Sequence, residues 1–284
     1  MTNMFKCIGN EVEAVPDNVL EGLGLSYEEL NRHDSNIAKL SKTLKNNKNI
    51  SFCRLPFCHT VEAETFGSTV VFDHKYGNRI GEYAIKDINS IGDLNKFDLS
   101  KGRIAEVLKA VKILKNDGEN IFLEITGPFT IGTSIINSEL FFKSIRKDKE
   151  KVIKLLALIE NNLVDFILEG VNSRTDIISF HDPAGTIDIV GPRIYKDLSG
   201  KYTYNILKRI EDKLGDAVVH LCGKTSTSLE SIGLLETEKV KVEGQDYFDK
   251  ILNIKNERKD IKYLGHWCLK TEAKTDELTV CKLV

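Results

Sequence analysis

Two kinds of apolar pattern alternate along most of the chain. Short runs of β-forming residues at 121–125, 176–180 and 217–222 predict buried strands. The stretches 138–171 and 193–213 have the length and the apolar spacing that are typical of helices. Because parallel strands need crossover connections, which are usually helices, this order favours a parallel sheet.

The same patterns extend toward both ends of the chain. They predict helical segments over 17–46 with a break at 22–26, a strand at 50–55, a hairpin over 69–72 and 79–84, a helix at 102–116, strands at 239–242 and 261–264, and a helix at 246–257. No linker, low-complexity tract or solenoid period interrupts the sequence, so we predict a single domain over residues 1–284.

Composition narrows the class of protein. The 284 residues are 41% hydrophobic and 29% charged, as in ordinary soluble globular proteins. A net charge of −2 gives no general attraction to nucleic acid or to anionic membranes, so we expect neither as a partner. No apolar run has the length of a signal peptide's apolar core or of a membrane span. We therefore expect a cytoplasmic protein.

Residues capable of chemistry follow several of the predicted strands. The carboxyl ends of parallel strands meet on one face, and in a (β/α)₈ barrel that face carries the active site. The strand ends are PFCH at 56–59, TGP at 126–128, HDP at 181–183, HLCG at 220–223, EG at 243–244 and GHWC at 265–268.

His220 and Cys222 are the first candidates for metal ligands. They lie two positions apart on one predicted strand, so their side chains leave the same face. Imidazole nitrogen and thiolate sulfur suit zinc, and Cys268 at a later strand end could supply a third ligand. Three protein ligands would leave a fourth position open, as in catalytic zinc sites. The spacing alone favours instead a hydrogen-bonded histidine beside a small buried cysteine.

Four segments match the motifs of one family, in the family's order. They read VHLCGKTS at 219–226, PFCHTVEAE at 56–64, GPFT at 127–130, and DPA at 182–184 followed by GP at 191–192. They resemble the H-x-C-G-x-T, P-F-C-x-T-V-E-A-E, G-P-x-T and D-P-A…G-P segments of the uroporphyrinogen decarboxylase superfamily. The resemblance is strongest to its corrinoid-dependent methyltransferase branch, typified by methylcobamide:coenzyme M methyltransferases.

This resemblance implies a (β/α)₈ TIM-type barrel that binds Zn²⁺ through His220, Cys222 and Cys268. It also implies transfer of a methyl group from a methylated corrinoid to a thiol or similar small-molecule acceptor. The methyl donor would be a corrinoid protein or free methylcobamide. The decarboxylases carry an arginine-rich segment that grips substrate carboxylates, and no counterpart precedes residue 50, which argues against porphyrinogen decarboxylation.

The sequence departs from the family pattern at both ends. The family's G-N-x-x-P strand end has no match between Glu243 and Gly265, and the first strand is reduced to residues 5–8. We therefore expect one reduced or missing β/α unit near the C-terminus and a shortened N-terminus. Gly265-His266 could also align with the family's Gly-Cys, which makes His266 the alternative third ligand. We favour Cys268 because a thiolate ligand makes the site more nucleophile-activating.

Five more residues are candidates for roles around the metal. Glu243 could occupy the open zinc position at rest, or be a solvated glutamate at a strand end. Glu62 and Glu64 could contact the cofactor or substrate, or stabilise a helix N-terminus. Asp182 could orient a ligand or form a strand-end turn. His59 is a further candidate for cofactor contact.

Other functions remain open within the same superfamily. The acceptor could be tetrahydrofolate or homocysteine. The chain could also be a non-catalytic barrel that keeps zinc and binds a corrinoid protein. A decarboxylase-like lyase, the last alternative, would need no metal.

Overall fold

The computed structural model describes residues 14–269 and 275–284, so the strand expected at 5–8 lies outside the described residues. The helices are α1 (Asp17–Leu23), α2 (Glu29–Arg32), α3 (Asp34–Lys48), α4 (Val61–Thr65), α5 (Gly102–Asn116), α6 (Pro128–Ile135), α7 (Ser138–Lys147), α8 (Lys149–Asn172), α9 (Ile187–Ile194), α10 (Gly200–Ile210), α11 (Gly223–Ser231) and α12 (Tyr247–Glu257). The strands are β1 (Cys53–Leu55), β2 (Val70–Val71), β3 (Arg79–Ile80), β4 (Ile121–Thr126), β5 (Ile177–His181), β6 (Val218–Leu221), β7 (Leu235–Lys241), β8 (Tyr263–Gly265) and β9 (Glu277–Leu283).

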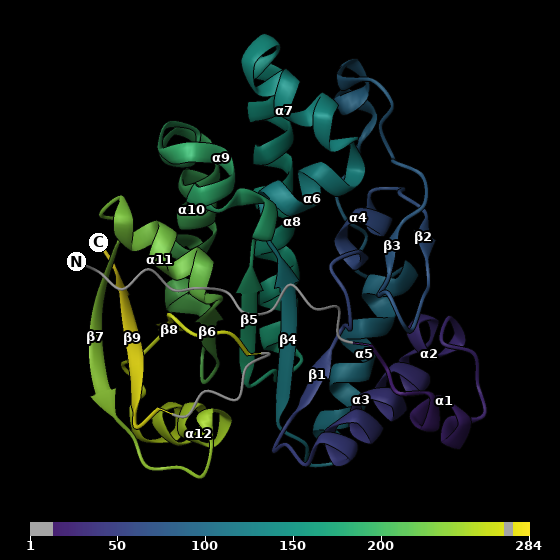
Figure 1. The fold of residues 1–284 in the computed structure, drawn as a ribbon, viewed down its shortest axis with the longest axis vertical. Helices are drawn as coiled ribbons and strands as arrows, with labels where there is room; N and C mark the ends of the chain where they lie inside the picture. The colour runs from purple at the N-terminus through teal and green to yellow at the C-terminus, as the bar shows by residue number, and fades with distance from the viewer. Residues whose placement is uncertain (1–13, 270–274) are drawn as a thin grey trace.

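A seven-stranded sheet with the order β1-β4-β5-β6-β8-β9-β7 lies at the centre of the fold (Figure 1). Strands β1, β4, β5, β6 and β8 pair in parallel, while β9 is antiparallel to both β8 and β7. Strands β2 and β3 form the separate hairpin expected from the sequence. The mostly parallel α/β sheet is therefore confirmed.

The closed (β/α)₈ TIM-type barrel is not confirmed. Within the described residues the sheet is open, with β1 at one edge and β7 at the other. The physical reason is β9, which the sequence pattern did not predict. It pairs with β8 through residues 279–281 and with β7 through all seven of its residues, so β7 is held away from β8 and β6. In Figure 1, β7 and β9 form one side of the molecule and α1 to α3 the opposite side.

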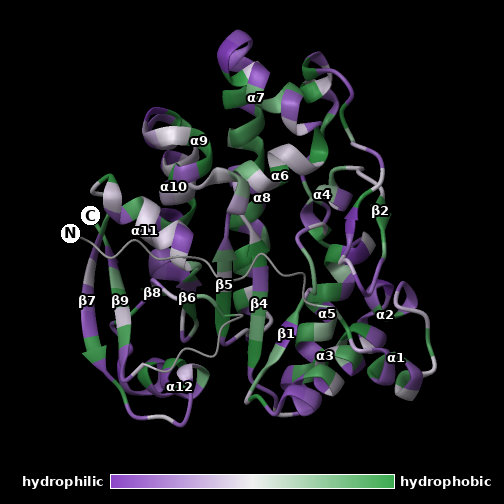
Figure 2. Cartoon of the chain, viewed as in Figure 1, coloured by the Kyte–Doolittle hydropathy of each residue, from purple (hydrophilic) through white to green (hydrophobic). Residues whose placement is uncertain are grey.

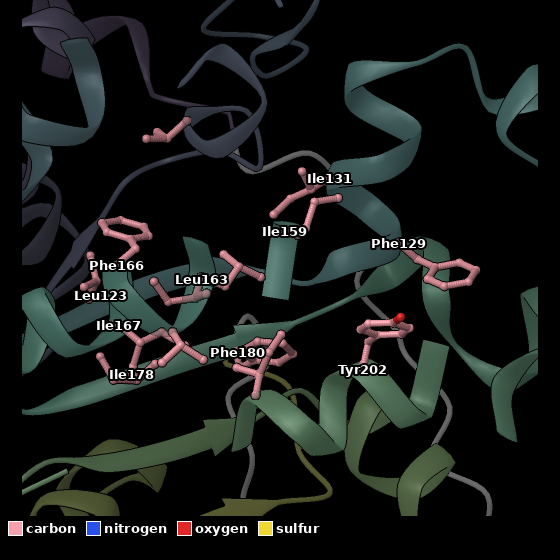
Figure 3. Packing of buried hydrophobic residues seen from close by; sticks show 14 of the residues in the cluster. Leu123, Phe129, Ile131, Ile159, Leu163, Phe166, Ile167, Ile178, Phe180 and Tyr202 are labelled. Atoms are coloured by element: carbon pink, nitrogen blue, oxygen red, sulfur yellow. The ribbon is translucent and has the colours of Figure 1, made fainter. Parts of the chain in front are cut away.

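Both faces of the parallel sheet are covered, which explains why its strands read as apolar runs. Figure 2 shows β4 and β5 as largely hydrophobic, and all six residues of β4 are buried. On one face, Leu123, Ile178 and Phe180 pack against apolar residues of α8 that recur at helical spacing (Figure 3). No helix in the described part of the chain is both long and apolar enough to span a membrane.

The second face packs against α12 at the end where the strands begin. Phe52 lies just before β1 and Phe122 in β4; their rings are 4.0 Å apart between centroids, and Phe248 of α12 lies 4.3 Å from Phe52. Leu264 of β8 and Ile251 of α12 belong to the same cluster. Helix α12 thus covers this face where the parallel strands begin. The part of the face where the strands end is left for a cavity. The prediction of one domain over residues 1–284 stays a prediction.

Candidate functional site

A cavity of about 270 Å³ lies at the carboxyl ends of the parallel strands, on the face that α12 covers at its other end. Side chains two apart on a strand share a face, and the strand register aligns Glu124, Ser179 and His220 across β4, β5 and β6. All three line the cavity, as do His181 and Cys222, two residues further along β5 and beyond β6. The sheet therefore directs one row of polar side chains into the cavity.

His220 is fully buried and is oriented by a tyrosine. Its Nε2 lies 2.9 Å from the hydroxyl of Tyr247 at the start of α12, and the two rings are edge-on. Nδ1 is buried, and no hydrogen-bond partner in the described residues reaches it. Burial lowers the pKa of His220 to about 3, so the imidazole is neutral, which is the form that binds metal ions.

The loops after β6 and β8 bring Cys222 and Cys268 to the same cavity. The backbone N–H of Gly223 donates a hydrogen bond to the carbonyl of Trp267 at 3.0 Å, which joins the two loops beside both cysteines. Cys268 is buried and Cys222 half-buried, and both line the cavity together with His220. The one imidazole and two thiols predicted from the sequence thus share one cavity.

His266, the alternative third ligand, is directed elsewhere. Its backbone has a φ of 65°, and its Nε2 lies 3.0 Å from a carboxylate oxygen of Glu230 on α11. It is not among the described residues that line the cavity. This geometry favours Cys268 over His266 as the third metal ligand.

The chemistry of the cavity fits a zinc ion. Two thiols and one neutral imidazole are soft and borderline donors of the kind that zinc prefers. Among the described residues the buried Nδ1 of His220 has no hydrogen-bond partner, and metal coordination would satisfy it. The residues present therefore fit Zn²⁺.

Glu64 lies in the segment 56–64 and joins it to α5. It forms an ion pair with the guanidinium of Arg103, which also donates to Thr60 Oγ1 at 2.7 Å and contacts Cys58 Sγ at 3.3 Å. Arg32 lies 3.4 Å from the same carboxylate. These contacts hold the segment 56–64 against α5, which gives much of its sequence a structural role. Glu64 is absent from the described lining of the cavity.

Glu62 is a residue of α4, and its buried carboxyl group lies against the end of β4. Its Oε1 accepts a hydrogen bond of 2.8 Å from the backbone N–H of Thr126, and Oε2 has no hydrogen-bond partner within the described residues. Burial raises the pKa of Glu62 to about 7, although the hydrogen bonds from Thr126 act to lower it. This residue does not line the cavity either.

Glu62→Gln is expected to change how stability depends on pH. The pKa of Glu62 rises from 4.5 to about 7 on folding, so the native state keeps a proton that the unfolded chain loses. Wild-type stability therefore falls between about pH 4.5 and 7, by about 3 kcal/mol relative to Glu62→Gln. Urea unfolding at several pH values would measure this, with exposed Glu82→Gln as the matched control. Parallel pH curves for wild type and Glu62→Gln would contradict it.

Asp182 binds the N-terminus of α6. Its Oδ1 accepts hydrogen bonds from the N–H and hydroxyl of Thr130 at 2.8 and 2.7 Å, and its Oδ2 accepts one from the N–H of Phe129 at 3.1 Å. A Cβ at Gly127 would overlap the Asp182 side chain, which explains the glycine of the GPFT motif. Burial raises the pKa of Asp182, although these hydrogen bonds act to lower it. Asp182 thus joins β5 to α6, and although its neighbours His181 and Pro183 line the cavity, Asp182 itself does not.

Glu243 lies just beyond β7, exposed to solvent. Strands β9 and β8 separate β7 from β6, and Glu243 is not part of the described cavity lining. Its backbone carbonyl accepts a hydrogen bond from the side-chain amide of Asn253 at 2.8 Å. The geometry gives no support to the hypothesis that Glu243 is a metal ligand.

His59 lines the cavity beside His181, which also follows a predicted strand, and beside Arg54 and Glu124, which sequence reasoning missed. Arg54 and Glu124 line the same wall and form a partly buried ion pair. Glu124 is a single charged residue within the apolar run of β4, and that contrast is the signal that could have identified it.

Comparisons with known proteins agree with the family resemblance seen in the sequence. The family model described as uroporphyrinogen decarboxylase (URO-D) matches residues 15–269. Two curated proteins, each a methylcobamide:CoM methyltransferase MtbA, come from Methanosarcina mazei and Methanosarcina acetivorans. Each is 25% identical over 214 residues, covering 74% of this chain and 63% of the relative. A solved methyltransferase from Methanosarcina mazei shares the fold with a TM-score of 0.65 and 19% identity, over 75% of this chain and 63% of that one.

Proposed function

The chain belongs to the uroporphyrinogen decarboxylase family, and from this premise we propose that it moves a methyl group from a methylated corrinoid to a thiol, with a zinc ion held by His220, Cys222 and Cys268. The observation that carries the proposal is the shared cavity of one imidazole and two thiols, with a buried imidazole nitrogen left for a metal. The names of the relatives from Methanosarcina support the corrinoid donor and the thiol acceptor.

A zinc ion in this cavity would lower the pKa of an acceptor thiol, so that the thiolate is present near neutral pH. The reaction forms a sulfur–carbon bond and breaks the carbon–cobalt bond, whose electron pair stays on cobalt as Co(I). The thiol proton leaves to solvent. The work of the protein is to position the two reactants and to exclude water.

The residues of this chain supply that positioning. Tyr247 fixes the ring of His220, and the hydrogen bond between Gly223 and Trp267 fixes the loops that carry Cys222 and Cys268. Pro183 and Leu269 form apolar parts of the cavity wall. A corrinoid protein or free methylcobamide would approach from the open side of the cavity.

The experiment supplies methylcobalamin to the zinc-loaded protein with coenzyme M, homocysteine or tetrahydrofolate as acceptor. We expect loss of methylcobalamin absorbance with one thiol and a matching amount of methylated product by mass spectrometry. Bound zinc without demethylation by any acceptor would favour the alternative of a non-catalytic, corrinoid-binding protein. Methylation of tetrahydrofolate alone would assign the other acceptor class.

A further inference from the structure

Two histidines and a carboxylate converge on the cavity wall apart from the residues used above. His59 follows β1, Glu124 belongs to β4, and His181 ends β5. The Nδ1 of His59 and the Nε2 of His181 lie 2.5 Å apart. One donor atom from each of the three residues lies within 4.8 Å of the other two. Three separate segments of the chain therefore bring their donor atoms close together.

We propose that His59, His181 and Glu124 hold a second divalent transition-metal ion. Two imidazoles and one carboxylate are the donor set of many catalytic zinc sites and of non-haem iron sites. Facing imidazole nitrogens can share one hydrogen bond only if one ring is the donor. A metal ion instead uses the lone pairs of both rings.

The adjustment that a metal would require is small. In a tetrahedral site with bonds of about 2.1 Å, two ligand nitrogens lie about 3.4 Å apart. The two rings would therefore separate by about 1 Å, which rotation of side chains on a loop and at a strand end can provide. Both histidines are half-buried, so an ion can reach them.

Arg54 orients the carboxylate. Its Nε donates a hydrogen bond of 2.8 Å to Glu124 Oε1, and its Nη2 contacts the same oxygen. Such partners commonly hold metal-binding carboxylates in place. Burial acts to raise the pKa of Glu124, and the guanidinium of Arg54 is the neighbouring charge that acts most strongly to lower it. The guanidinium charge also opposes a cation, so this site should be the weaker of the two.

The cluster of His59, Glu124 and His181 lies between two cavities. Arg54, His59 and Glu124 line the cavity of His220 and also a second cavity of about 190 Å³, whose other walls include Leu44 and Phe57. A metal ion here would sit in the shared wall. Its remaining coordination positions would be open to water.

The test is a metal titration of the metal-stripped chain, residues 1–284, with Zn²⁺ and with Co²⁺. We expect two equivalents per chain in wild type, the second bound more weakly and removed first by dialysis. His59→Gln and His181→Gln should each bind one equivalent, while Cys222→Ser should keep the weaker one. Exposed His33→Ala is the matched control and should bind two. Circular dichroism would confirm that each variant is folded.

Cobalt spectra separate this proposal from the zinc site of the proposed function. Only a site with thiolate ligands gives sulfur-to-cobalt charge transfer, so the histidine variants should keep that band while losing one equivalent. Saturation of wild type at a single equivalent that shows the charge-transfer band would overturn the second site, as would two equivalents in both histidine variants. If the charge-transfer band is absent but one equivalent depends on His181, the second site stands and the thiolate site fails.

Discussion

Cys268→Ser should lose the thiolate metal site and with it methyl transfer. A serine hydroxyl stays protonated near neutral pH and is a far poorer zinc ligand than a thiolate. Loss of a partner outside the coordination shell already weakens metal binding by about 10- to 100-fold. We therefore expect loss of a direct ligand to weaken it by at least ~100-fold. Competition with a chromogenic chelator and the intensity of the cobalt charge-transfer band would measure this.

His266→Gln is the matched control, because His266 lies two residues from Cys268 in the same loop after β8. Its Nε2 is directed to Glu230 on α11 and not to the cavity. We expect zinc affinity within about twofold of wild type, as for a change that removes no ligand. Zinc retained by Cys268→Ser but lost from His266→Gln would assign the third ligand to His266 instead.

The strands that frame the cavity were predictable because each is a short apolar run between helical segments. The closed barrel was not confirmed, since local periodicity does not specify which strands become neighbours. The position of β9 is set by pairing with β8 and β7, whose residues lie at least 14 and 36 positions before their partners in β9 along the chain. Such long-range contacts do not affect the spacing of apolar residues within β7. The sequence pattern therefore predicted only part of that strand.

The residues of the site also divide into those that the sequence predicted and those that it did not. His220, Cys222 and Cys268 were found because their types and positions match a motif, and the structure places them in one cavity. Glu124 was missed, although it is aligned with Ser179 and His220 in the sheet. Tyr247 was missed because it lies on a helix and reaches His220 only through the packing of α12 against the sheet.

Tyr247→Phe should weaken zinc binding while preserving the packing of α12. The substitution removes only the hydroxyl that lies 2.9 Å from His220 Nε2. Without it the imidazole is no longer held in one orientation, and the loss of such a partner costs about 10- to 100-fold in metal affinity. A buried nitrogen left without a partner also lowers the free energy of unfolding by about 1–3 kcal/mol. Methyl transfer should recover in excess zinc, because the ligands themselves remain.

Tyr263→Phe supplies the matched control for this change. Tyr263 is also buried, and its hydroxyl donates a hydrogen bond of 2.7 Å to the carbonyl of Leu207, on the opposite face of the sheet from His220. It should lose comparable stability but bind zinc as wild type does. Zinc titration and urea unfolding of both variants separate the two effects. Equal loss of zinc affinity in both would show that Tyr247 acts through general stability, and unchanged affinity in Tyr247→Phe would show that its hydroxyl does not position His220.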